Sequence, residues 1–198
     1  MNELETINYY NQNAVRFTVE TVQVNFESTQ KRFAGKLPAG AAILDFGCGS
    51  GRDTKYFLSQ GYQVDAVDGS AELCRLAGEY TGVNVKNMFF HELAEVERYD
   101  GIWACSSILH LPLEELADVM RKMVAALKHN GIIYASFKYG KGMRNDKGRL
   151  FYDYDEIALK NIAVNSCFWV EDIFVTQDVR NGRENEQWIN VLARKIIP

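Results

Sequence analysis

The chain is poor in the patterns that build metal sites, disulfide frameworks and membrane spans. Its four cysteines contain no CxxC pair, and its three histidines lie at no ligand spacing from them, so neither zinc nor disulfides are indicated. No run of about 18 apolar residues occurs. The N-terminal residues include acids and amides where a secretory signal needs a basic and then an apolar segment. We therefore expect a cytoplasmic protein without a membrane partner.

Excess positive charge is also absent. The 198 residues contain 26 acidic and 22 basic side chains, which gives a net charge of −4. Proteins that neutralise many phosphates carry a basic surface, so no nucleic-acid partner is expected. A hydrophobic content of 47% over this length is enough for one core. We expect a single domain over residues 1–198, with a helical cap or lid at 1–36 and an α/β core at 37–198.

The stretch AAILDFGCGSGRD is the strongest feature that the chain does contain. An apolar run ends at Asp45 and is followed by Gly47, Gly49 and Gly51. A buried parallel strand that turns into a helix through positions without side chains lets a ligand reach backbone N–H groups. The pattern therefore predicts a ligand pocket at the end of this strand.

Strand and helix patterns alternate over most of the chain. A helical cap is expected from Asn13 to about Lys36, and Ser70 is expected to cap a later helix. Apolar runs predict strands at 41–46, 62–67, about 83–88, 99–106 and 132–137, and helices at 51–60, after Ser70, from Pro112 to Gly131 and at 155–164. This alternation predicts a doubly wound α/β fold, whose mostly parallel sheet binds ligands at its carboxyl ends.

The last part of the chain has the pattern of antiparallel structure. The runs FWVEDIFVTQDV and EQWINVLARKI flank Asn181 and Gly182, and an Asn-Gly pair between strands favours a hairpin. A terminal antiparallel pair at one edge would complete a seven-stranded sheet. The polar segment KYGKGMRNDKGRLFYDYD, which precedes the last helix, is typical of a mobile loop at the carboxyl edge.

The spacing of the glycines in the loop distinguishes between two classes of nucleotide-binding site. A dinucleotide site has glycines at the first, third and sixth loop positions, and here the sixth is Arg52. Asp45 followed by GxGxG instead resembles the class I S-adenosylmethionine-dependent methyltransferases, as do Asp68 after the second strand, the segment YDGIWACSSILHL and the terminal hairpin. YYNQNA, DFGCGSGRD and WACSSILHLP are similar to small bacterial methyltransferases of the tellurite- and thiopurine-detoxifying type. The resemblance covers nearly the whole chain.

This resemblance implies a Rossmann-like fold with S-adenosyl-L-methionine as cofactor and S-adenosyl-L-homocysteine as product. It implies that the amides of Gly47, Cys48 and Gly49 cradle the methionine part, with Asp45 near its amino group. Asp68 would accept both ribose hydroxyls, because each carboxylate oxygen is an acceptor. Alternatively, Asp45 only fixes a strand end and Asp68 only caps a turn or helix.

The adenine and the sulfonium also have candidate neighbours. By the same resemblance, Met88 and Phe89 would hold the adenine, Gly69 would lie beside it, and Cys105 in the fourth-strand motif would belong to the cofactor site. Core packing is an equal alternative for Met88 and Phe89. Tyr10 in the helical cap would contact the sulfonium by a cation–π interaction, or alternatively pack on the sheet.

Methyl transfer from a sulfonium needs mainly in-line positioning and exclusion of water, which can contribute about 7–11 kcal/mol. His110 is the candidate general base, because its unperturbed pKa is about 6.5; the alternative is a structural loop histidine. Tyr139, Arg149 and Phe151 are candidate acceptor contacts. Arg149 would suit an anionic acceptor, or is simply solvated. The segment ACSSILHL lacks the NPPY-type tetrad of base-methylating members, which favours a small-molecule acceptor.

Two other functions are compatible with parts of this pattern. A noncatalytic S-adenosylmethionine-binding or sensor protein would use the same glycine loop without an acceptor pocket. A nicotinamide-dependent oxidoreductase is disfavoured by Arg52 and by the Asn181–Gly182 pair. The sequence assigns no metal and no oligomeric state.

Overall fold

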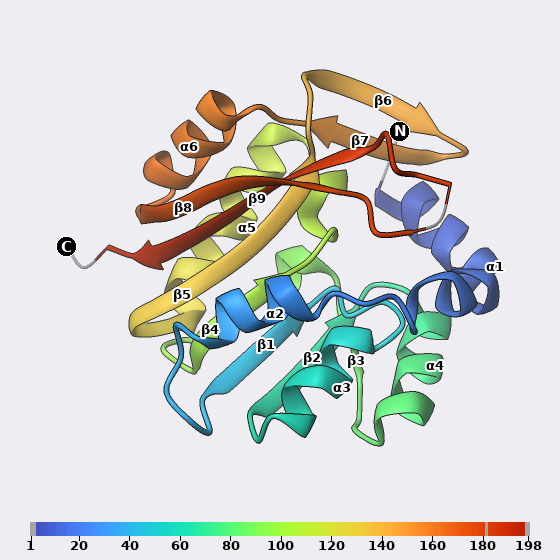
Figure 1. Cartoon of the computed structure of the whole chain (residues 1–198), viewed down its shortest axis with the longest axis horizontal. Coiled ribbons are helices and arrows are strands. Elements are labelled where there is room, and N and C mark those ends of the chain that lie inside the picture. The colour runs from blue at the N-terminus through green and yellow to red at the C-terminus, as the bar shows by residue number, and fades with distance from the viewer. Residues whose placement is uncertain (1–2, 181, 197–198) are drawn as a thin grey trace.

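A seven-stranded sheet forms the centre of the computed structural model, which describes residues 3–180 and 182–196 (Figure 1). The strand order is β3-β2-β1-β4-β5-β9-β8. The first five strands in this order are parallel, whereas β9 is antiparallel to both of its neighbours. The predicted α/β fold with a terminal antiparallel pair is therefore confirmed. The strands are β1 (Ala42–Phe46), β2 (Gln63–Asp68), β3 (Lys86–Asn87), β4 (Tyr99–Ala104), β5 (Leu127–Lys138), β8 (Phe168–Gln177) and β9 (Gln187–Lys195).

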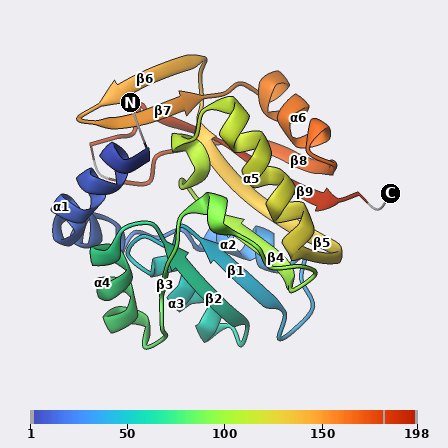
Figure 2. The ribbon, with the colours of Figure 1, turned by 180° about the vertical axis from the view of Figure 1, so that it is seen from behind.

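Helices cover both faces of the sheet, as Figures 1 and 2 show from opposite sides. On one face, Phe33 of α2 and Phe57 of α3 pack against Trp103 of β4. On the other face, α5 and α6 bury their apolar stripes in a larger core. The helices are α1 (Glu3–Thr21), α2 (Glu27–Ala34), α3 (Arg52–Ser59), α4 (Ala71–Thr81), α5 (Leu113–Ala126) and α6 (Glu156–Asn165).

The N-terminal segment differs from the single helical cap that the sequence predicts after Asn13. It forms two helices, α1 and α2, which are separated at residues 22–26. Helix α1 contacts α4 and lies across the carboxyl ends of the strands, whereas α2 packs on a face of the sheet (Figure 1). Of these two helices, α1 is therefore the one that can cover a site at the strand ends.

The end of α5 also differs from its prediction. The sequence predicts a helix as far as Gly131, but the helix ends at Ala126 and β5 begins at Leu127. Leu127 is buried and pairs with Tyr99, and the register then shifts before the regular pairing of the two strands resumes. Asn130 takes a positive φ of 61° within this irregular stretch. Strand pairing and burial outweigh continuation of the helix.

The segment expected to be a mobile loop is a β-hairpin. Strands β6 (Gly142–Asp146) and β7 (Arg149–Asp153) pair in antiparallel register as a second, two-stranded sheet that contacts α1 through β7 (Figure 1). Lys147 and Gly148 connect the strands with φ angles of 57° and 88°. Positive φ at both positions is the geometry of a type I′ turn. The loop prediction is wrong because it weighed polar composition above this turn pattern.

The connection between β8 and β9 is longer than a two-residue turn, because it spans residues 178–186. Gly182 has a positive φ of 78°, and Asn181 lies outside the described residues. Side chains of this connection face the carboxyl ends of the sheet. Among the described helices, none is long and apolar enough to cross a membrane.

Candidate functional site

A cavity of about 490 Å³ lies between the carboxyl ends of the parallel strands, helix α1 and the β6–β7 hairpin. Its glycine-loop end is formed by the loop after β1 and the residues after β2. Its hairpin end is formed by the end of β5, the β6–β7 hairpin and the β8–β9 connection. Most of the site residues expected from the sequence line it: Tyr10, Gly47, Cys48, Gly49, Asp68, Gly69, Cys105, His110, Tyr139, Arg149 and Phe151.

The glycines of the loop after β1 allow neighbouring side chains to pack closely against the backbone, and two of the loop N–H groups are already hydrogen-bonded. A Cβ on Gly47 would lie 2.4 Å from Cβ of Ser107, and one on Gly49 would lie 3.1 Å from the Phe17 ring. The N–H groups of Gly47 and Cys48 both donate to the Val67 carbonyl at 2.9 Å. The sequence predicts that a ligand reaches these N–H groups directly, but strand β2 already accepts the hydrogen bonds of Gly47 and Cys48.

Asp68 is the acidic group at the glycine-loop end. One carboxylate oxygen accepts from the Gly49 N–H at 2.9 Å, and the other accepts from the Ser70 N–H at 2.8 Å. Burial raises the pKa of Asp68, while these two backbone hydrogen bonds act to lower it. Because a carboxylate oxygen can accept more than one hydrogen bond, both oxygens keep capacity for a ligand.

Three expected residues lie outside the lining of the cavity. Asp45 is buried below the glycine loop, where it accepts from the Thr54 hydroxyl at 2.5 Å, and burial raises its pKa to about 8. Met88 is a core residue. Phe89 stacks on His91, with ring centroids 5.5 Å apart. This placement agrees with the alternatives of a tied strand end for Asp45 and core packing for Met88.

Arg52 and Asp53 are lining residues that sequence reasoning did not assign to the site. The Arg52 guanidinium donates two hydrogen bonds of 2.8 Å to the Asp53 carboxylate and lies 4.5 Å from the Phe26 ring centroid. Burial acts to raise the pKa of Asp53, but the charge and hydrogen bonds of Arg52 outweigh it and lower the pKa. The sequence feature that could have indicated this pair is the position of Arg52 directly after Gly51, the last glycine of the loop.

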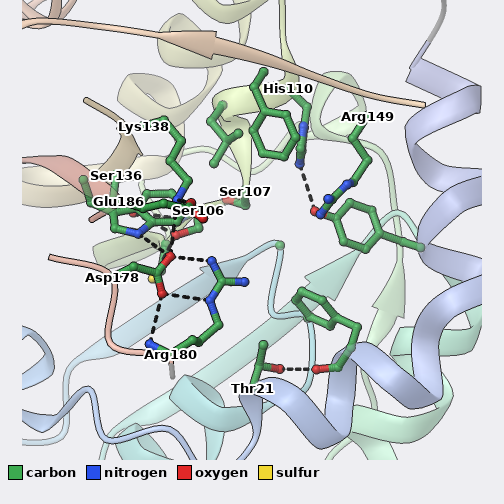
Figure 3. Close-up of a pocket in the computed structure, with 18 of the residues that line it drawn as sticks. Thr21, Ser106, Ser107, His110, Ser136, Lys138, Arg149, Asp178, Arg180 and Glu186 are labelled. Atoms are coloured by element: carbon green, nitrogen blue, oxygen red, sulfur yellow. Dashed lines mark hydrogen bonds and ion pairs between the residues drawn. The ribbon is translucent and has the colours of Figure 1, made fainter. Parts of the chain in front are cut away.

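His110 is held in one tautomer at the hairpin end. Its Nδ1 bonds to the Leu150 carbonyl, which can only accept, so Nδ1 carries the proton. Nε2 of His110, which is labelled in Figure 3, therefore accepts from the Tyr10 hydroxyl at 3.0 Å. Burial lowers the pKa of His110 to about 4. This pKa lies below the unperturbed value of about 6.5 that made His110 a candidate general base, and the ring is neutral at pH 7.

Two of the three expected acceptor contacts, Phe151 and Arg149, lie near His110. The Phe151 ring lies edge-on to the His110 ring at 4.8 Å. Arg149 donates to the Asp146 carboxylate at 2.5 Å, and its guanidinium carbon lies 4.4 Å from the Tyr9 ring centroid. Tyr139 is more exposed, and its hydroxyl donates to Glu156 at 3.2 Å.

A buried ionic cluster on the other side of the cavity was missed by sequence reasoning (Figure 3). The Lys138 ammonium bonds to Glu186, lies 3.3 Å from the Asp178 carboxylate and lies 3.9 Å from the Trp188 ring centroid. Asp178 also accepts from the Arg180 guanidinium at 2.9 and 2.5 Å. A lysine at the end of an apolar strand was the only local signal.

The described residues place no group of three or more His, Cys, Asp or Glu side chains where they could hold a metal ion. The sheet order and the glycine loop after β1 define the class I S-adenosylmethionine-dependent methyltransferase fold. Residues 43–131 match the methyltransferase domain family. This match spans less than half of the chain, which has the fold of the class I methyltransferases.

Comparisons with individual proteins agree with this assignment. The chain is 37% identical over 132 residues to human N-terminal Xaa-Pro-Lys N-methyltransferase 1, covering 63% of this chain and 57% of that protein. It spans about half the length of the curated relatives that it matches. A solved structure of Burkholderia thailandensis 1,6-didemethyltoxoflavin-N1-methyltransferase with S-adenosylhomocysteine superposes with a TM-score of 0.77 and 24% identity, covering 98% of this chain and 88% of that chain. Synechocystis magnesium protoporphyrin IX methyltransferase with S-adenosylmethionine gives a TM-score of 0.74, 18% identity and coverage of 98% of both chains.

Proposed function

We propose that this protein transfers the methyl group of S-adenosylmethionine to a small-molecule acceptor. The observation that carries the proposal is a single cavity with two different ends. The glycine loop and Asp68 line one end, and His110, Arg149 and Phe151 line the other. Solved neighbours with bound S-adenosylhomocysteine or S-adenosylmethionine support the choice of cofactor.

The glycine-loop end fits the polar groups of this cofactor. Asp68 accepts the ribose hydroxyls with the acceptor capacity that the backbone leaves on its two oxygens. Arg52 keeps donors beyond those given to Asp53 and pairs with the cofactor carboxylate. The rings of Tyr10 and Phe17, whose centroids lie 5.4 Å apart, offer faces to the sulfonium. The bound cofactor supplies an activated methyl group.

The hairpin end positions the acceptor in line with that methyl group and excludes water. Helix α1 contacts strand β7 there through the packing of Arg149 on Tyr9. Tyr10 of α1 also bonds to His110, whose Nδ1 bonds to the Leu150 carbonyl of β7. This covering favours a small acceptor. The identity to human N-terminal Xaa-Pro-Lys N-methyltransferase 1 supports a second candidate, a protein N-terminal amine.

The proposal is tested by calorimetry with S-adenosylhomocysteine, followed by an assay of its formation from S-adenosylmethionine with small acceptors and with peptides. Binding and turnover with small acceptors is the expected result. Binding without turnover across both panels would favour a sensor protein. Binding of NAD without binding of S-adenosylhomocysteine would favour an oxidoreductase, and turnover with peptides alone would favour the second candidate.

The role of His110 is tested by two substitutions. Glutamine can accept from Tyr10 and donate to Leu150, so we expect His110→Gln to retain most of the transfer rate. His110→Leu can do neither and should lower the rate and loosen α1. A pKa of about 4 makes the ring a weak base at pH 7. Equal loss in both variants, with loss of a pH-dependent limb of the wild-type rate, would instead support the general-base role.

A further inference from the structure

The inner face of the β6–β7 hairpin alternates positive and negative side chains. Arg144 and Asp146 of β6 and Arg149, Phe151 and Asp153 of β7 all line the cavity. In the hairpin register, Arg144 lies opposite Phe151 and Asp146 lies opposite Arg149. Side chains two residues apart on a strand share a face. The five residues therefore form one continuous surface toward the cavity.

Two guanidinium groups on this surface flank one aromatic ring. The guanidinium carbons of Arg144 and Arg149 lie 4.5 and 5.1 Å from the Phe151 ring centroid. Arg144 donates through Nε to Asp153 at 2.9 Å, and Arg149 donates to Asp146. Each guanidinium has five N–H donors. Both groups therefore keep donors that a ligand resting on Phe151 can use.

The charges that line the cavity are distributed unequally. At the glycine-loop end, the carboxylates Asp53 and Asp68 outnumber the cation Arg52. At the hairpin end, the described lining residues include five Lys or Arg side chains and four Asp or Glu side chains. S-adenosylmethionine has a sulfonium, an ammonium and one carboxylate. Its net charge is therefore positive, which matches the excess of carboxylates at the glycine-loop end. The second end favours a negative ligand.

We propose that the methyl acceptor is a planar aromatic anion, held against Phe151 by the guanidinium groups of Arg144 and Arg149. This inference rests on the proposed function and names the class of its acceptor. During transfer, the attacking atom gives an electron pair to the methyl carbon, and the pair of the breaking carbon–sulfur bond stays on sulfur. An acceptor whose attacking atom is ionised loses no proton, which agrees with a neutral His110.

Benzoate and benzamide are matched probes that differ in charge and little in shape. Their binding to the complex of the protein with S-adenosylhomocysteine is measured by calorimetry. We expect benzoate to bind at least about tenfold more tightly, and added salt to weaken benzoate alone. Arg144→Gln and Arg149→Gln should remove most of this preference, whereas Arg149→Lys should keep part of it. Asp146→Asn, which releases Arg149, should strengthen benzoate binding.

Arg121→Gln is the matched control, because Arg121 is exposed on α5 and pairs with Asp118 away from the cavity. It should leave both probes unaffected. Equal binding of benzoate and benzamide, or failure of benzoate to bind protein that binds S-adenosylhomocysteine, would overturn the inference and leave the proposed function standing. Failure of the wild-type protein to bind S-adenosylhomocysteine would instead overturn the proposed function.

Discussion

Asp68→Asn should weaken binding of S-adenosylhomocysteine by at least about 100-fold, which corresponds to roughly 3 kcal/mol. Both carboxylate oxygens accept a backbone N–H, one from Gly49 and one from Ser70. An amide in either orientation turns its NH₂ group toward one of these donors. The variant therefore loses a hydrogen bond to a charged group, worth about 1.5–3 kcal/mol, and the acceptor for one ribose hydroxyl.

Asp65→Asn is the control for this prediction. Asp65 lies on the same strand, but it is exposed and bonds to Arg98 and Tyr99 outside the cavity. It removes the same charge and should leave the calorimetric affinity within about twofold, as expected for exposed ion pairs. Unchanged affinity in Asp68→Asn, or an equal loss in the two variants, would contradict the role given to Asp68.

The sequence predicted those elements whose determinants are local. Ser70 caps α4 by accepting from the Leu73 N–H at 3.2 Å, and Asp155 caps α6 in the same way. Both caps depend on residues three positions apart. The alternation of apolar runs with such caps is enough to predict a parallel sheet and the edge at which ligands bind.

Features that depend on distant partners could not be predicted in this way. The amides of Gly47 and Cys48 are paired because Val67 lies beside them in the neighbouring strand. Asp45 is buried outside the lining of the cavity, where it accepts from the Thr54 hydroxyl of α3. The low pKa of His110 follows from burial under Tyr10 of α1. Each of these facts depends on packing between separate segments.

The β6–β7 hairpin was missed for a different reason. Its determinants are local, since Lys147 and Gly148 form a two-residue turn and the flanking residues alternate in charge. The charged side chains lie on the inner face, where a half-buried strand normally shows apolar residues, and this conceals the strand pattern. A strand whose inner face lines a polar cavity therefore resembles a loop in composition.

The buried carboxylate of Asp178 gives the second large prediction. Asp178 is 2% exposed on its side chain, and its partners are Lys138, Arg180 and Trp188. Asp178→Asn removes the negative charge that Lys138 and Arg180 share. Breaking a buried ion pair on one side costs about 3–5 kcal/mol, so we expect the free energy of unfolding at pH 7 to fall by about that amount.

Asp172→Asn is the control. Asp172 lies on β8, the strand that directly precedes Asp178, and it pairs with Arg32 at a more exposed position. Its loss should cost about 0–1 kcal/mol in the same urea titration. The double variant Asp178→Asn with Lys138→Met should be more stable than the Asp178→Asn variant, because it removes one of the two buried cations that Asp178 partly neutralises. Equal effects of the two single substitutions would show that the cluster does not stabilise the fold.

The pH dependence of this difference follows from the pKa of Asp178. Burial acts to raise that pKa, but the hydrogen bonds and charge of Arg180 outweigh burial and hold it well below its usual range. A carboxyl group with a lowered pKa stabilises the folded state above its unfolded pKa of about 3.9. The stability gap between wild type and Asp178→Asn should therefore be constant from neutral pH down to about pH 5. It should narrow only as the pH falls below the unfolded pKa toward the lower folded value, and a gap that closes near neutral pH would show that another group carries the effect.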